Sequence, residues 1–185
     1  MLNLFQSKLQ IESLINKADN AKETKRLTQK FHRLKTDRKP FYITLEELND
    51  ILKWKLRKQF ERQGKGRELN SNENVCVITK AAFAITHTDK DFETILKLKL
   101  LSTLTGVVVR VASAILTLCF PKQYAVIDFK NWQQIYKSAQ RKTNYSPNDY
   151  IEYLKIIRQL AKKYDVTPQE IDIAIWQKDF EDKQK

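Results

Sequence analysis

The most informative segment of the chain is LSTLTGVVVRVASAILTLCFPKQYAVIDFKNWQQI, residues 101–135. Gly106 separates two apolar runs with helical spacing, and Pro121 directly follows the second run. A glycine supplies the backbone freedom that a tight turn needs, and a proline ends a helix. We therefore predict two helices joined by a short hairpin, the second of them extending from Arg110 to Cys119.

The predicted hairpin has a chemistry suited to a phosphate group. The first amides of a helix lack partners within that helix and carry partial positive charge, so they bind anions. Arg110 adds a full positive charge in the first turn of the second helix, and Gly106 and Val108 lie at the turn itself. Such contacts reach the DNA backbone rather than the bases, so the hairpin predicts DNA binding without strong sequence preference.

A carboxylate follows the hairpin. Residues 124–127 (YAVI) predict an extended segment, and Asp128 directly precedes the helical pattern of Trp132 and Ile135. One interpretation is that Asp128 only caps this helix, as aspartates often do. The other is catalytic, because a partly desolvated carboxylate stabilises positive charge that develops on a sugar when its glycosidic bond breaks.

These two segments resemble a known family. Residues 104–116, LTGVVVRVASAIL, resemble the hairpin L-P-G-V-G-x-x-x-A-x-x-(I/V)-L of the helix–hairpin–helix (HhH-GPD) DNA glycosylases. Residues 124–132, YAVIDFKNW, are similar to the segment in which these enzymes place an aspartate after an extended apolar triplet, and Arg110 and Asp128 are eighteen positions apart, as in the family. The resemblance implies an all-α HhH-GPD fold. It also implies an enzyme that flips a damaged or modified base and hydrolyses its N-glycosidic bond with Asp128 as the catalytic carboxylate.

The sequence departs from the family pattern within the hairpin. Arg110 stands where bifunctional members have a lysine, and a guanidinium cannot form the imine that lyase chemistry requires. Val108 replaces the second hairpin glycine and Thr105 replaces the proline, and a β-branched residue resists a positive φ angle. Two cysteines, Cys76 and Cys119, cannot ligate the iron–sulfur cluster of some members. The resemblance therefore implies a monofunctional enzyme with an altered hairpin and no metal or other cofactor.

The composition favours a helical protein. The 185 residues include three glycines and four prolines, too few for the turns of a sandwich or barrel of many short strands. Hydrophobic residues make up 42% of the chain, which excludes a disordered protein. We predict a basic N-terminal helical extension, residues 1–39, and a glycosylase-like helical core, residues 40–185.

Capping sequences predict where several helices begin. Thr44, Thr88, Ser146 and Thr167 each precede an acidic residue by three positions, and a proline follows the last two directly. The mostly apolar residues 75–85 fit either a buried helix or a strand, because periodicity alone does not separate the two.

A net charge of +12 points to a polyanionic partner. Residues 1–39 carry ten lysines and arginines against four acids, and a second basic cluster follows Ile51. Lys53 and Arg57 are four residues apart and share one face of the helix predicted after Thr44, with Lys58 beside them. We expect these three residues to contact the phosphates of duplex DNA, and we expect the same of Lys130 beside the predicted carboxylate. The alternative is that these side chains only solvate helix faces.

Three residues are candidates for a base pocket: Trp54, the adjacent Lys55, and Tyr124. Aromatic rings and polar side chains hold an extruded base, although aromatic residues at helical spacing also form ordinary cores. The sequence does not identify the base.

The sequence leaves three functions open: a monofunctional DNA glycosylase, a non-catalytic DNA-binding module with the same hairpin, and a helical protein whose basic faces bind an acidic partner. The first residues lack the features of a secretory signal, and the apolar run from Val107 to Phe120 is too short for a bilayer. We expect a cytoplasmic monomer without a membrane partner, associated with the nucleoid if the protein is bacterial.

Overall fold

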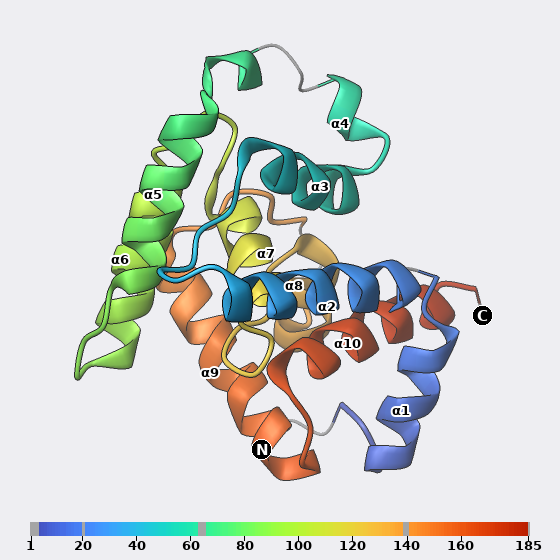
Figure 1. Ribbon diagram of the computed structural model, residues 1–185. Coiled ribbons are helices and arrows are strands. Elements are labelled where there is room, and N and C mark those ends of the chain that lie inside the picture. Colours follow the sequence, from blue (N-terminus) through green and yellow to red (C-terminus); the bar gives the residue numbers. More distant parts are fainter. Residues whose placement is uncertain (1–3, 20, 63–65, 139–140, 185) are drawn as a thin grey trace.

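The computed structural model describes residues 4–19, 21–62, 66–138 and 141–184, and every regular element in these ranges is a helix. The protein is therefore all-α in the part that the structure describes (Figure 1). The elements are α1 (Lys8–Lys17), α2 (Ala21–Asp37), α3 (Leu45–Leu56), α4 (Gln59–Arg62), the short 3-10 helix η1 (Arg67–Leu69), α5 (Asn72–Ala84), α6 (Lys90–Leu101), α7 (Val109–Cys119), α8 (Phe129–Tyr136), α9 (Pro147–Tyr164) and α10 (Pro168–Asp182).

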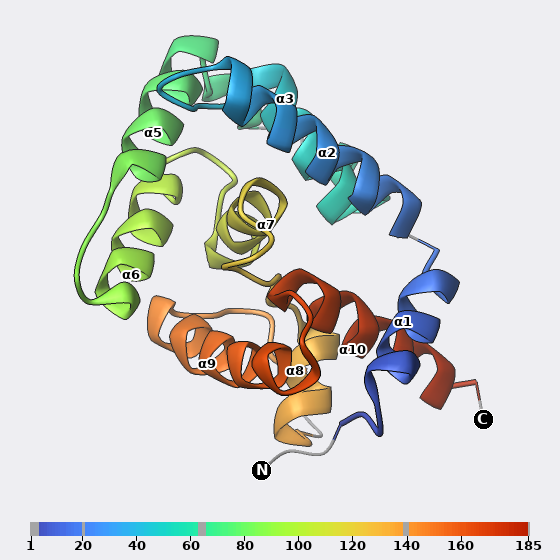
Figure 2. The same ribbon diagram turned by 60° about the horizontal axis from the view of Figure 1, so that its bottom comes forward.

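Helix α7 is the centre of the molecule. The other helices surround it when it is viewed along its axis (Figure 2). Every residue from Val111 to Cys119 is buried, and helices α2, α3 and α6 pack against this helix. The predicted second helix of the hairpin is thus confirmed, beginning one residue before Arg110. A helix that is apolar on all sides is stable only when it is enclosed in this way.

The N-terminal 39 residues pack on the rest of the chain. Helix α1 lies along α10, and α2 lies against α7 (Figures 1 and 2). Leu27 and Phe31 of α2 are fully buried, and the Tyr164 hydroxyl donates a hydrogen bond to the carbonyl of Phe5. The apolar stripe of this segment is therefore part of the hydrophobic core.

Three of the four predicted helix starts are confirmed. Thr44, Ser146 and Thr167 each accept a hydrogen bond from the amide three residues later, and each belongs to a complete capping box. The prediction for Thr88 is wrong by one residue. Asp89 caps α6, because its carboxylate accepts hydrogen bonds from the amides of both Asp91 and Phe92.

The segment from Val75 to Ile85 is helical up to Ala84, within α5. The expected burial holds for one face only. Val75, Thr79 and Ala82 are buried, whereas Val77 is 59% exposed.

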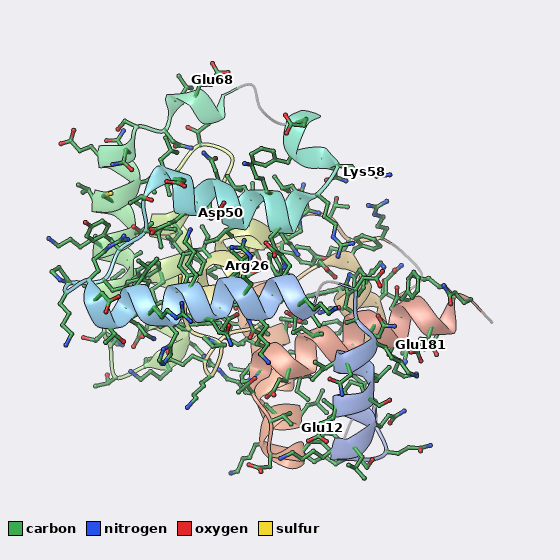
Figure 3. All side chains as sticks on the ribbon, turned by 45° about the vertical axis from the view of Figure 1, so that its right-hand side comes forward. Glu12, Arg26, Asp50, Lys58, Glu68 and Glu181 are labelled. Atoms are coloured by element: carbon green, nitrogen blue, oxygen red, sulfur yellow. The ribbon has the colours of Figure 1, made fainter. Side chains whose placement is uncertain are left out.

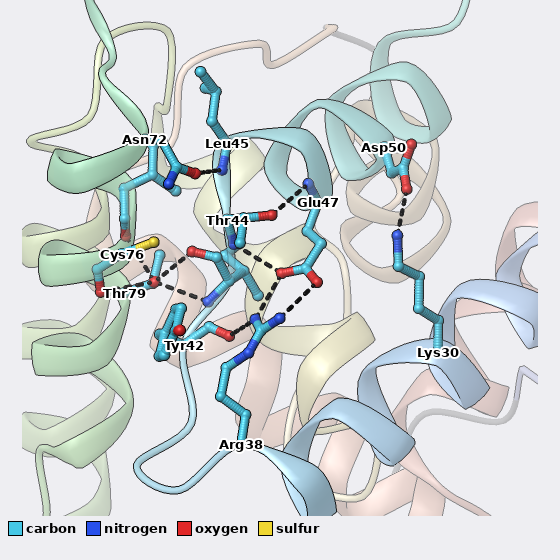
Figure 4. A network of polar contacts seen from close by, with 12 residues as sticks. Lys30, Arg38, Tyr42, Thr44, Leu45, Glu47, Asp50, Asn72, Cys76 and Thr79 are labelled. Carbon is cyan, nitrogen blue, oxygen red and sulfur yellow. Dashed lines mark hydrogen bonds and ion pairs between the residues drawn. The ribbon is translucent and has the colours of Figure 1, made fainter.

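A polar network fixes the start of α3 between α2 and α5 (Figure 4). The guanidinium of Arg38 donates to both carboxylate oxygens of Glu47, at 2.9 and 3.1 Å, and Glu47 also accepts from the Thr44 amide. From α5, the Thr79 hydroxyl contacts the backbone of Ile43 and the Asn72 side chain accepts from the amide of Leu45. The network therefore anchors the first turn of α3 to the segment before it and to α5.

Within the described ranges, no helix has both the length and the apolar character needed to span a membrane.

Candidate active-site cavity

A cavity of about 290 Å³ opens beside Asp128, and we call it the Asp128 cavity. Its walls come from the end of α3, the first turns of α7 and α8, and the inner face of α10. Six residues that the sequence analysis selected line this cavity: Trp54, Lys55, Arg57, Arg110, Asp128 and Lys130. They come from three parts of the chain that are distant in sequence, residues 54–57, 110 and 128–130, so the fold brings them together.

The extended segment 124–127 sets the position of Asp128. No strand pairs with these residues among those described, so side chains satisfy the backbone instead. The amide of Ile127 donates to the Ser113 hydroxyl of α7 at 3.1 Å, and the amide of Val126 donates to a carboxylate oxygen of Asp172 at 3.0 Å. Buried polar backbone groups need such partners. The segment is thereby fixed to both α7 and α10.

Asp128 both caps α8 and faces the cavity. Its Oδ1 accepts hydrogen bonds from the amides of Lys130 and Asn131, each at 3.0 Å. Its Oδ2 lies 3.6 Å from the Nζ of Lys55, and the side chain is 17% exposed. The two interpretations of Asp128 are therefore compatible, because one oxygen holds the carboxylate in place and the other remains available to the cavity.

Two further titratable groups lie close to Asp128. Burial lowers the pKa of Lys55, against the opposing effect of Asp128 and Asp172. Burial and the charge of Asp128 together raise the pKa of Asp172 to about 8. Asp172 therefore holds its proton to a higher pH than an exposed aspartate does.

Aromatic side chains form part of the wall. Trp54 donates its indole N–H to the Thr24 hydroxyl at 3.0 Å, and two cations lie over the ring of Trp176. The Lys130 Nζ is 4.2 Å from the centre of the Trp176 ring, and the Arg57 guanidinium carbon is 5.2 Å from it. Both tryptophans line the cavity, which gives it flat apolar surfaces beside charged groups.

The hairpin between α6 and α7 has a single glycine in the left-handed region. Gly106 has a φ of 82°, a conformation that residues with a Cβ rarely adopt. Val108 has a φ of −89°, so its side chain causes no backbone strain, and it is 57% exposed. Within the described chain, no side chain caps the first turn of α7. The exposed hairpin thus presents an uncapped helix N-terminus next to Arg110.

Asn70 holds this hairpin from behind. Its side-chain amide donates to the Thr105 carbonyl at 2.8 Å, and its side-chain oxygen accepts from the Thr105 amide at 2.9 Å. Asn70 itself is 6% exposed and follows η1. These two bonds replace the constraint that a proline at position 105 would have provided.

Three of the residues selected from the sequence, Lys53, Lys58 and Tyr124, belong neither to the Asp128 cavity nor to the hairpin. Lys53 and Lys58 are exposed, and neither lines the cavity. Lys58 lies at the surface between α3 and α4 (Figure 3). The prediction that Lys53 and Arg57 share one helix face is wrong, because α3 ends at Leu56 and Arg57 has a φ of 49°.

Tyr124 does not belong to the Asp128 cavity. It is 2% exposed and borders a separate cavity of about 710 Å³ near the start of α6, where its ring contacts Phe120. The acidic group of that second cavity, Glu93, is paired with both Lys90 and Lys97. These ion pairs lower the pKa of Glu93 to about 2, although burial alone would raise it.

Asp172 and Trp176 of the cavity and Asn70 behind the hairpin are not predicted from the sequence. Asp172 and Trp176 are four residues apart on α10, so they share a face of that helix. Asp172 lies between Ile171 and Ile173 in the apolar run IDIAI, and an acid in such a run is a sign of a buried carboxylate. The role of Asn70 has no comparable sign in the sequence, because its partner is thirty-five residues away.

No group of three or more histidine, cysteine or acidic side chains among the described residues is arranged to hold a metal ion. Comparison with models of protein families, with curated proteins and with solved structures finds no match for this chain.

Proposed function

We propose that this protein is a DNA N-glycosylase with an HhH-GPD-like fold and with Asp128 as its catalytic carboxylate. The observation that carries the proposal is the cavity beside Asp128, which also contains Arg110 and two tryptophans. Its volume of about 290 Å³ is at the lower end of the range for small-molecule pockets, about 300–1,000 Å³. One extruded nucleotide is a ligand of suitable size and chemistry.

Duplex DNA binds through its backbone in this proposal. The uncapped start of α7 and the exposed hairpin offer amides to one phosphate, and Arg110 supplies a cation beside them. The net charge of +12 supports a polyanionic partner. An affinity of this type falls linearly with the logarithm of salt concentration, with a slope of about −0.9 per neutralised phosphate.

Asp128 supports cleavage of the glycosidic bond through charge and orientation. Departure of the base leaves positive charge on the deoxyribose, and a fixed carboxylate close to C1′ stabilises that charge. Oδ1 is held by two amides, so Oδ2 needs little reorganisation during the reaction. The same oxygen can orient the water that attacks C1′. Trp54 offers an aromatic surface in the cavity wall on which the extruded base can stack.

A non-catalytic DNA-binding module is the second candidate, and one observation favours it. Val108 places an exposed side chain where the family has its second hairpin glycine, which hinders close approach of a phosphate. The open cavity favours the enzyme over the module, because a protein that only holds the DNA backbone has no use for a charged pocket of this size.

The proposal is tested with duplex oligonucleotides that each carry one damaged or modified base. After incubation with the full-length protein, alkali cleaves any abasic site, and strand cleavage is measured against an unmodified duplex. We expect cleavage at one class of base. Binding to duplex DNA without release of any base would instead support the non-catalytic module, and absence of DNA binding at low salt would contradict both candidates.

A further inference from the structure

The amine of Lys55 is enclosed within the Asp128 cavity. Lys55 belongs to the last turn of α3, its side chain is 10% exposed, and its Nζ lies 3.6 Å from Oδ2 of Asp128. Lysines are seldom buried to this extent unless they are paired. A lysine that served only to solvate the helix would extend into water, as the neighbouring Lys53 does.

The surroundings of Lys55 favour the neutral amine. Burial lowers the pKa of its ammonium group, and the positive charge of Arg110 on α7 acts in the same direction. Asp128 at the start of α8 and Asp172 on α10 oppose this effect. The opposition from Asp172 is weakened at neutral pH because its own pKa is raised to about 8. An uncharged lysine amine is a nucleophile toward carbonyl carbon.

We propose that Lys55 is an imine-forming nucleophile, and that this protein cleaves the DNA strand at abasic sites in addition to releasing the base. The inference rests on the proposed function, because the aldehyde of the ring-opened deoxyribose at an abasic site is the carbonyl group that base excision delivers to this cavity. The expectation of a monofunctional enzyme rests only on the arginine at hairpin position 110. The structure brings an amine into the cavity from a different helix.

The chemistry needs no group beyond this cavity and water. The Nζ–C1′ bond forms, and the carbonyl oxygen leaves as water with one proton from the amine and one from an acid. The resulting iminium ion acidifies C2′, and Asp128 lies within reach of Lys55 to accept that proton. The electron pair then forms the C1′–C2′ enamine and, in turn, expels the phosphate oxygen from C3′. One water molecule hydrolyses the imine and restores the amine, so no oxidant or reductant is consumed.

A structural role for Lys55 predicts different behaviour. If Lys55 only neutralises Asp128, an arginine at this position keeps the ion pair and retains every property of the protein. If Lys55 is the nucleophile, the same substitution removes imine formation, because a guanidinium stays protonated. Lys55→Arg therefore separates the two roles.

The test uses the full-length protein, a duplex with one preformed abasic site, and borohydride, which reduces an imine to a stable amine. We expect the wild type to form a covalent complex with the DNA that survives denaturing electrophoresis, and mass spectrometry to locate the adduct on Lys55. Lys55→Arg should lose the complex while it still binds the abasic duplex. Lys80→Arg, an exposed lysine on α5, is the matched control and should form the complex as the wild type does.

Each outcome decides the inference. A wild type that binds abasic DNA without forming the complex overturns it, as does an adduct on another amine or full trapping by Lys55→Arg. If Lys55→Arg does not fold, the location of the adduct in the wild type decides alone. Because the abasic site is preformed, the result is separate from base excision. Trapping without base release contradicts only the proposed function, and base release without trapping contradicts only this inference.

Discussion

Asp128 shows how one side chain can cap a helix and face a cavity at the same time. A helix cap needs one oxygen that accepts from backbone amides, and Oδ1 meets this need with two bonds of 3.0 Å. The second oxygen faces Lys55 at 3.6 Å, inside the cavity. The two roles are alternatives at the level of the sequence, because a sequence does not give the direction of each carboxylate oxygen.

Asp172 is expected to make the stability of the protein depend on pH. Its pKa is raised to about 8 in the folded state by burial and by Asp128, whereas an unfolded aspartate has a pKa of about 4. Between these values the unfolded chain ionises more readily than the folded one, so this residue lowers the free energy of unfolding as the pH rises. Asp172→Asn removes the effect and keeps an acceptor for the Val126 amide. Lys55 also faces this carboxyl and partly offsets the shift.

Urea unfolding of the wild type and of Asp172→Asn across this pH range measures the difference. We expect the variant to gain stability relative to the wild type as the pH rises from about 4 to about 8. Asp37→Asn, at the exposed end of α2, serves as the control and should follow the wild type. A stability difference that is constant with pH would show that Asp172 titrates normally.

At the scale of the elements, the hairpin depends on a residue outside it. Asn70 makes two hydrogen bonds to Thr105 while Gly106 takes the positive φ angle. The hairpin of this chain lacks both the proline and the second glycine of the pattern it resembles. A side chain from the segment before α5 therefore takes over part of the task of holding the turn.

Asn70→Ala is expected to lower both stability and DNA affinity. Loss of the two bonds leaves the polar groups of Thr105 to water, at a cost of about 1–3 kcal/mol in the free energy of unfolding. We also expect weaker binding to every duplex sequence, because the hairpin amides lose their fixed direction. Thermal unfolding and fluorescence anisotropy with labelled DNA measure the two effects. Asn148→Ala, an exposed position in the first turn of α9, provides the comparison and should change neither. Unchanged DNA affinity in Asn70→Ala would place the DNA contact away from the hairpin.

Across the whole molecule, the sequence predicted what depends on local chemistry. The capping boxes at Thr44, Ser146 and Thr167 and the enclosed helix α7 follow from short patterns, and the structure confirms them.

Features that depend on long-range packing could not be predicted in this way. Asp172 reaches the backbone of Val126 across forty-six residues, and no local pattern records that contact. Helical periodicity put Arg57 on the same face as Lys53, but the left-handed backbone at Arg57 turns its side chain toward Trp176. The burial of Lys55 likewise depends on side chains of α7, α8 and α10 that line the same cavity.

The rate of base release by Asp128→Asn under single-turnover conditions tests whether Asp128 acts on the glycosidic bond. Asparagine still accepts from the amides of Lys130 and Asn131, so the cap and the fold should persist. We expect unchanged or slightly tighter DNA binding, because a negative charge near phosphates is lost. We expect the rate to fall on the order of a hundred- to a thousandfold, because the developing positive charge loses its partner. A folded variant that releases the base at the wild-type rate would show that Asp128 only caps α8, and it would contradict the account.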